Sequence, residues 1–275
     1  MALLYFLGIF VGMLIPIQTS VNSRLSQYTR SSFYASTVSF GVGTLCLIIL
    51  NLIINPHMLT PQFFTEQTFN YHWFVGGLLG VCFLTGNLLL LPRLGAALTV
   101  VITVAGQIIM GVAIDTLGLF GASQQPFTLF KAVGIVLLLI GILLMNQIPK
   151  DKLLRQSHSN LYIWLIVGFI FGCAPPIQTT INSALAKEVH SSFFASLVSF
   201  TIGTIALLIL TLIFHRSLKI NQTHPDLGHI KSIYFVGGIL GMAFVTSNVI
   251  LMPFLGAALT TIVGMLGQML MGVII

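Results

Sequence analysis

Charge is what this sequence has least of. Only 6% of its 275 residues are Asp, Glu, Lys or Arg, whereas 56% are hydrophobic and the mean hydropathy is +1.04. A water-soluble globule of this length needs far more polar surface to cover its core. The lack of charge therefore excludes a water-soluble globular protein, and the lipid bilayer is the expected solvent and partner of the chain.

Cysteines and catalytic motifs are scarce as well. The three cysteines, Cys46, Cys82 and Cys173, fall in separate apolar runs without metal-ligand spacing, so we interpret them as small core residues and predict no metal and no cofactor. No glycine-rich phosphate loop follows a strand, and no Ser, His and Asp set lies at membrane depth, so we predict that the chain is not an enzyme. The pI near 9.5 comes without a dense basic run, and we expect no nucleic acid partner.

Long apolar runs are what the sequence does contain. Lipid offers no hydrogen-bond partner to backbone groups, so such runs are expected to be helices, each needing about 20 residues to cross the hydrocarbon. The sequence predicts nine of them, over residues 2–19, 33–54, 73–91, 95–114, 129–147, 161–180, 193–214, 233–252 and 256–275. The first lacks a basic leader and a cleavage pattern, so we predict a retained helix rather than a signal peptide.

The chain also contains two copies of one pattern. PIQTSVNSRLSQYTRSSFYASTVSFGVGT (16–44) returns 160 positions later as PIQTTINSALAKEVHSSFFASLVSFTIGT (176–204), with 17 of 29 residues identical. Likewise, GGLLGVCFLTGNLLLLPRLGAALT (76–99) returns as GGILGMAFVTSNVILMPFLGAALT (237–260). Internal duplication of membrane helices is typical of secondary transporters.

Helix counts differ between the two repeats. Residues 1–150 form a first repeat with five predicted transmembrane helices, and residues 151–275 a second repeat with four. Because Ile275 aligns with Ile114, a tenth helix is missing, and we interpret the chain as a fragment or a truncated gene product.

Basic residues indicate how the repeats are oriented. Of the Lys and Arg residues only Lys131 and Lys187 fall on one predicted side, and by the positive-inside rule that side is outside and includes the N-terminus. The cytoplasmic set is Arg24, Arg30, Arg93, Lys150, Lys152, Arg155, Arg216, Lys219 and Lys231. Arg24 and Arg93 align with Ala184 and Phe254, so the charges have changed sides between the copies. An odd helix count likewise requires the second repeat to be inverted; the alternative is a parallel duplication with scattered charges.

Several motifs carry a family resemblance. At PIQTSVNSRL, SSFYASTVSF, GNLLLLPRLGAALT and AGQIIMGVAIDTLGLFG the chain resembles the YdcZ-like branch of the drug/metabolite transporter superfamily, in its fused two-half form without the last helix. The resemblance covers nearly the whole chain. It implies an all-α integral membrane protein of two inverted five-helix repeats, a ten-helix fold of which nine helices are present here. It also implies the bacterial inner membrane and transport of small molecules by alternating access.

Amide side chains are the candidate substrate ligands. Polar residues inside a bilayer are costly and usually face a cavity or another helix. We predict substrate binding by eight amides that recur between the copies: Gln18, Asn22, Asn87, Gln107, Gln178, Asn182, Asn248 and Gln268. Pro16 and Pro176 precede two of these pairs and are predicted to break their helices. The alternative interpretation is that the amides only join helices to one another. For Ser39 and Ser199, with glycine and alanine at four-residue spacing, we prefer such packing.

Other local patterns predict structure rather than binding. Glycine pairs at four-residue spacing are predicted to let helices approach closely: Gly8 with Gly12, Gly76 with Gly80, Gly168 with Gly172, and Gly237 with Gly241. The serine pairs at 31–32 and 191–192 are predicted to cap the helices that follow them. We interpret the longer loops at 55–72 and 215–231 as solvated connections.

No Asp, Glu, Lys, Arg or His lies in the central part of any predicted helix. A proton-coupled exporter of the small multidrug type needs such a carboxylate, whose charge alternates between a proton and a cationic drug. We therefore predict a neutral, polar or amphipathic small-molecule substrate moved by facilitated export, or coupling through a group that the sequence does not reveal. Asp115 is the one candidate for titration, and we interpret it as a solvated group at a helix end.

Three functions fit these observations. The leading hypothesis is a secondary transporter, either an exporter or a facilitator. The second is a channel built on inverted repeats, with the paired amides along its permeation path. The third is an accessory membrane subunit that transports nothing alone, and the sequence leaves open whether the chain forms a homodimer.

Overall fold

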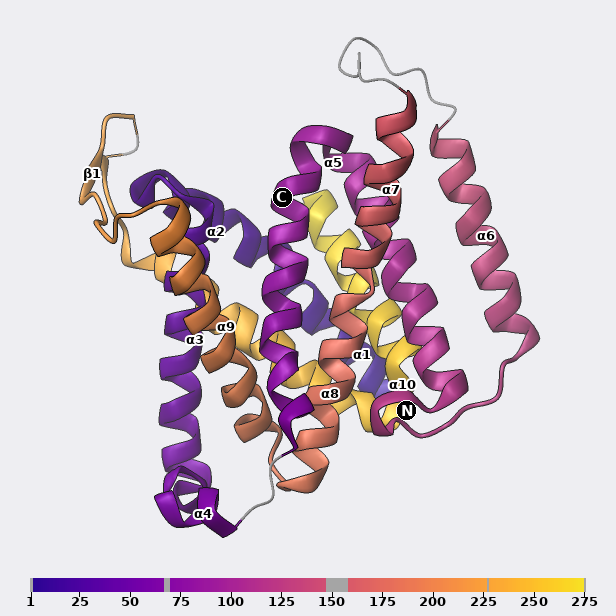
Figure 1. The fold of residues 1–275 in the computed structure, drawn as a ribbon, viewed down its shortest axis with the longest axis horizontal. Helices are drawn as coiled ribbons and strands as arrows, with labels where there is room; N and C mark the ends of the chain where they lie inside the picture. The colour runs from indigo at the N-terminus through magenta and orange to yellow at the C-terminus, as the bar shows by residue number, and fades with distance from the viewer. Residues whose placement is uncertain (1, 67–69, 147–157, 227, 275) are drawn as a thin grey trace.

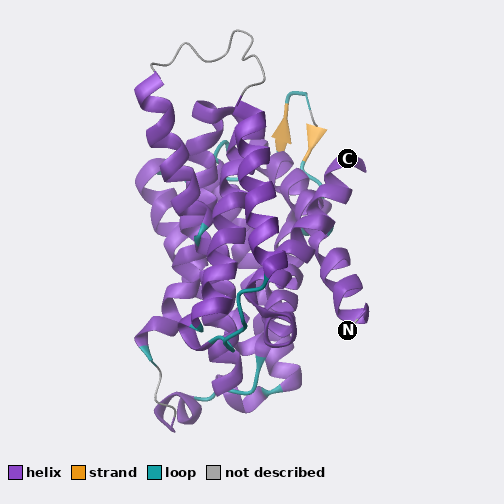
Figure 2. Ribbon diagram, turned by 90° about the vertical axis from the view of Figure 1, so that its right-hand side faces the viewer, coloured by secondary structure: helices purple, strands orange, loops and turns teal. Residues whose placement is uncertain are grey.

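The computed structural model describes residues 2–66, 70–146, 158–226 and 228–274, and shows an integral membrane protein that is almost wholly α-helical, as predicted (Figure 1). The elements are α1 (Ala2–Gly12), α2 (Leu14–Thr29), α3 (Ser32–Ile54), α4 (Pro61–Glu66), α5 (Val75–Leu117), α6 (Leu129–Asn146), α7 (His158–Gly172), α8 (Ala174–Glu188), α9 (Ser192–Phe214), β1 (Thr223–His224), β2 (Gly228–His229) and α10 (Gly237–Ile274). Short 3-10 turns join several of them. The strands form one small antiparallel hairpin (Figure 2).

Within the described residues, seven helical stretches are long and apolar enough to cross a membrane. They are Ala2–Thr29, Ser32–Ile54, Tyr71–Gly95, Leu98–Leu117, Leu161–Glu188, Ser192–Phe214 and Ser232–Ile274. The last one contains the two runs predicted at 233–252 and 256–275, and the run predicted at 129–147 corresponds to α6.

Helix starts and interruptions follow from local chemistry. The hydroxyls of Ser31 and Ser191 accept hydrogen bonds at 3.2 Å from the backbone N–H of Tyr34 and Phe194, so each serine caps the helix that begins after it. A break separates α1 from α2 at Met13, and another separates α7 from α8 at Cys173. Each break lies three residues before the predicted Pro16 or Pro176, which occupy the first turn of α2 and α8.

The long helices α5 and α10 each contain a turn. Gly95 (φ 73°, ψ 168°) and Gly256 (φ 79°, ψ 172°) have non-helical backbone conformations. Only glycine adopts these angles without steric strain. Pro92 and Pro253 lie three residues earlier. The predicted helix boundaries at 91–95 and 252–256 fall on these turns.

Helices of the first copy pack chiefly on helices of the second. The hydroxyl of Thr37 lies 2.8 Å from that of Thr211, and the hydroxyl of Thr44 lies 3.0 Å from that of Thr204. Going along α3 from Thr37 to Thr44, the partner in α9 changes from Thr211 back to Thr204, so the two helices run antiparallel. They lie side by side, as Figure 1 shows. In the same way α1 and α2 pack on α10, while α7 and α8 pack on α5.

Glycine allows the helices to approach one another closely. A side chain at Gly12 of α1 would overlap the backbone carbonyl of Gly264 in α10, and one at Gly172 of α7 would overlap that of Thr103 in α5. The predicted packing role of this small-residue spacing is therefore confirmed at both positions. Gly76 and Gly237 differ, because each faces an asparagine side chain rather than a neighbouring backbone.

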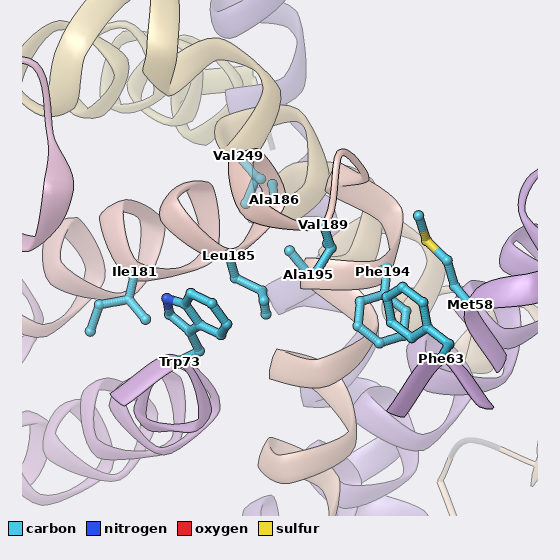
Figure 3. Packing of buried hydrophobic residues seen from close by; sticks show 10 residues of the cluster. All are labelled: Met58, Phe63, Trp73, Ile181, Leu185, Ala186, Val189, Phe194, Ala195 and Val249. Carbon is cyan, nitrogen blue, oxygen red and sulfur yellow. The ribbon is translucent and has the colours of Figure 1, made fainter. Parts of the chain in front are cut away.

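A buried apolar cluster joins the loop after α3 to the start of α9 (Figure 3). Met58 is 5% exposed and Phe63 is 9% exposed, and Phe63 packs edge-on against Phe194 with ring centroids 5.2 Å apart. We expected the loops at 55–72 and 215–231 to be solvated connections, and for these side chains that is wrong. Apolar residues in the first loop cover the end of the bundle formed by α8 and α9. We call this the α4 end.

Outward-facing apolar side chains cover much of the bundle. On α6 the exposed residues include Leu129, Val133, Val136, Leu137 and Ile140, and in a protein without polar surface such a face contacts lipid acyl chains. Among the cysteines, all of which are free, Cys82 is exposed and Cys46 and Cys173 are half-buried. The expectation that all three are core residues is therefore wrong for Cys82.

The close helix contacts predict a stability difference between two glycines. Gly12→Ala places a methyl group against the carbonyl of Gly264, whereas no described atom lies within 4 Å of a methyl group at Gly134. Overpacking of this kind costs about 1–3 kcal/mol. We expect Gly12→Ala to lower the thermal unfolding temperature in detergent and Gly134→Ala to leave it unchanged or slightly raised. Equal unfolding temperatures would contradict the α1–α10 packing.

Candidate substrate cavity

A cavity of about 400 Å³ lies at the α4 end, between α8, α10 and the segment after α5. Its polar lining comes from Asp115, Ser123, Gln125, Thr180, Ser183, Lys187 and Ser192. Its apolar lining includes Val249, Ile250, Met252, Pro253 and Phe254. Both copies therefore contribute to it. Its volume falls in the range of small-molecule pockets, and its lining of apolar surface with a few polar groups is typical of them.

Asp115 connects the two copies at the edge of this cavity. Its carboxylate accepts hydrogen bonds from the backbone N–H of Ala257 at 2.7 Å and of Ala258 at 3.0 Å. These N–H groups begin the helical segment after Gly256, where intrahelical acceptors are lacking and the helix dipole favours a negative charge. The backbone carbonyl of Asp115 also accepts a hydrogen bond at 2.7 Å from the N–H of Gln125.

Gly256 suits this contact for a second reason besides its backbone angles. A side chain at this position would lie 3.0 Å from both carboxylate oxygens of Asp115 and 2.6 Å from Nε2 of Gln125. At the corresponding Gly95, no described atom lies within 4 Å of an added Cβ. The two turns thus share a conformation, and the carboxylate of Asp115 lies beside the one that lines the cavity.

We expected Asp115 to be a solvated helix-end group, and this is wrong. Its side chain is only 1% exposed. The backbone N–H groups of the α10 turn replace water as hydrogen-bond partners of the carboxylate, which explains how it is buried here.

The predicted amides pack between the copies in two matching places. The side chain of Gln18 lies against Gly241 and that of Asn22 against Gly237, both in α10. In the same pattern, Gln178 lies against Gly80 and Asn182 against Gly76, both in α5. Nε2 of Gln178 also donates a hydrogen bond at 3.3 Å to the hydroxyl of Ser199. Four of the eight amides therefore occupy contacts between helices.

The asparagines in these contacts have buried polar atoms without a hydrogen-bond partner among the described residues. Asn182 is 0% exposed and neither its Oδ1 nor its Nδ2 is paired, and Oδ1 of Asn22 is also buried and unpaired. Unless water or a ligand pairs with it, such a group costs about 1–3 kcal/mol. The two amides therefore offer buried hydrogen-bonding groups between the helices.

The remaining amides lie elsewhere. Asn248 is buried, and Asn87, Gln107 and Gln268 are half-buried. None of the eight predicted amides, all of them in the described part of the chain, lines the 400 Å³ cavity. Substrate binding by these residues stays a prediction.

Sequence reasoning did not select the residues that line the cavity. The sequence indicates Lys187 only as a marker of membrane topology and Ser192 only as part of a helix cap. It gives Asp115 only as a solvated residue at a helix end. A usable signal was present in LPRLGAALT and MPFLGAALT, because a proline three residues before a glycine ends one helix and allows a turn before the next. The helix that begins after such a turn has free backbone N–H groups, and a carboxylate elsewhere in the chain is a suitable cap for them.

Comparison with known families matches residues 3–144 and 163–275 to the family described as "Putative inner membrane exporter, YdcZ". The chain belongs to this family. It is accordingly a multi-pass transporter of the inner membrane, and the predicted resemblance to the YdcZ-like branch is confirmed. A search of curated proteins found no match.

The Asp115 contact predicts a loss of stability in one of two aspartate variants. Asp115→Ala leaves the N–H groups of Ala257 and Ala258 buried without their partner, and hydrogen bonds to charged groups contribute about 1.5–3 kcal/mol each. Asp226→Ala changes an exposed residue and is the control. We expect only Asp115→Ala to lower the thermal unfolding temperature in detergent by several degrees. Similar temperatures for both variants would show that the carboxylate does not hold the turn.

Proposed function

We propose that this protein exports a small organic metabolite or drug by alternating access, with the cavity at the α4 end as the outer chamber of the substrate pathway. The observation that carries the proposal is the cavity itself, which has the volume of a small-molecule site and is built from both copies. In secondary transporters the substrate site likewise lies at the interface of the repeats.

The lining favours a neutral, polar or amphipathic substrate. Asp115 is the acidic group in the lining, and two backbone N–H groups already compensate its charge. The basic group in the lining, Lys187, is exposed, so water screens its charge. Hydroxyls of Thr180, Ser183 and Ser192 offer hydrogen bonds, while Met252 and Phe254 offer apolar surface. Such a site binds through hydrogen bonds and apolar contact rather than through a strong ion pair.

We further propose that residues 1–150 and 151–275 are two inverted repeats and that the N-terminus is outside. The antiparallel course of α3 and α9 supports inversion, because equivalent helices related by a two-fold axis in the membrane plane run in opposite directions. Lys187 lies at the α4 end, the end with few basic residues, so the cavity would open outward.

Reporter fusions test this orientation. We expect a reporter that is active only outside the cytoplasm to give signal when it is inserted near Gln124. After Gln156 we expect the same reporter to be silent. Cytoplasmic signal from the Gln124 fusion would overturn the proposed orientation and leave the packing of the two copies unaffected.

A cavity-filling variant tests the transport pathway. Ala184 lines the cavity, so Ala184→Trp should occupy much of its volume, whereas Leu137→Trp adds the same ring to the lipid-facing surface of α6. Comparing the medium of cells with and without the protein identifies the exported compound, and its saturable counterflow in proteoliposomes separates a transporter from a channel. We expect Ala184→Trp to reduce export at least tenfold and Leu137→Trp to leave it unchanged. Unchanged export in both would remove the cavity from the pathway.

A further inference from the structure

Helix α8 lies between the cavity on one side and helix α5 of the first copy on the other. Thr180, Ser183 and Lys187 lie on one side of the helix and line the cavity. Gln178 and Asn182 lie on the opposite side, against α5. Any displacement of α8 away from α5 therefore moves its other face into the cavity.

The connection between α7 and α8 suits such a displacement. The helices are interrupted at Cys173, and Pro175 and Pro176 follow as the second and third residues of α8. Neither proline has an N–H, so they leave the carbonyls of Phe171 and Gly172 without the usual helical hydrogen bond. The break is thus a local weak point about which α8 can tilt.

The contact between Asn182 of α8 and Gly76 of α5 is close, but it leaves the amide of Asn182 without hydrogen bonds among the described residues. Oδ1 of Asn182 lies against Gly76, and a side chain on that glycine would overlap it. Neither polar atom of the Asn182 amide has a hydrogen-bond partner among the described residues. A tilt of α8 would allow water to hydrate the amide, which offsets the loss of packing. The unpaired amide thereby narrows the free-energy gap between the two positions of the helix.

We propose that α8 is a movable wall of the cavity, and that its present open position requires α8 to approach α5 closely where Asn182 meets Gly76. When this close approach is lost, α8 tilts about Cys173 toward the α10 turn and closes the cavity. In this step Asn182 is a positioning residue, because it acts through the distance between α8 and α5. The proposal deepens the proposed function and rests on it for its meaning in transport, but its test requires no substrate.

Cysteine labelling measures the access to the cavity directly. In protein with Cys46, Cys82 and Cys173 replaced by Ser, Ala184→Cys provides a single thiol in the cavity for a membrane-impermeant maleimide. Gly76→Ala pushes α8 off α5, and we expect it to slow labelling at least fivefold. Asn182→Ala removes the overlapping amide, so the Gly76→Ala/Asn182→Ala pair should return to the parent rate.

The equivalent contact at the other end of the molecule provides a matched control. Gly237→Ala creates the same overlap with Asn22, but α2 does not line this cavity. The part of α10 that lines it begins at Val249, about three helical turns beyond Gly237, so labelling should keep the parent rate. Unchanged labelling in Gly76→Ala, equal slowing in Gly237→Ala, or no recovery in the paired variant would overturn the proposal. If Gly76→Ala fails to fold, Asn182→Gln lengthens the same contact and should slow labelling too.

The test separates this proposal from the proposed function. Labelling that follows these expectations, together with unchanged export by Ala184→Trp, would establish a moving wall and reject the cavity as the substrate chamber. Unchanged labelling together with lost export by Ala184→Trp would retain the chamber and reject the moving wall.

Discussion

Close approach between the backbones of the two copies is the constraint on which the structure depends. Lipid provides no hydrophobic force that drives helices together, so their association relies on packing at short range. Gly12 against Gly264 and Gly172 against Thr103 supply that packing on the two sides of the bundle. The antiparallel pair α3 and α9, with its two threonine contacts, is a further contact between the copies. Contacts with α5, α1 and α2 position α8 and α10, two of the elements that line the cavity.

Much of the fold could be predicted from the sequence, since bilayer thickness and backbone hydrogen bonding leave few solutions for long apolar runs. The serine caps, the turns at Gly95 and Gly256 and the close packing at Gly12 followed from local patterns that occur twice. The breaks at Met13 and Cys173 lie three residues before the predicted prolines. A first-turn proline fits a helix start, so the interruption falls before it rather than at it.

The cavity could not be predicted in the same way. Asp115 and its partners Ala257 and Ala258 are 142 and 143 positions apart, and a carboxylate at a helix end reads alike whether water or a distant turn binds it. The amides illustrate the opposite error. Polarity inside an apolar run indicates a partner but does not distinguish a substrate from a glycine of the next helix, and Asn22 and Asn182 face glycines.

The turn at Gly256 shows how a contact between the copies builds a wall of the cavity. Its backbone angles are nearly those of the turn at Gly95, so the conformation follows from glycine alone. Its surroundings come from the first copy, since the carboxylate of Asp115 accepts hydrogen bonds from the N–H groups of Ala257 and Ala258 just after the turn. The carbonyl of Asp115 also binds the N–H of Gln125, so one residue joins the end of α5, the segment that follows it and the α10 turn. All three parts line the cavity, and the Asp115 contacts therefore fix the positions of these walls relative to one another.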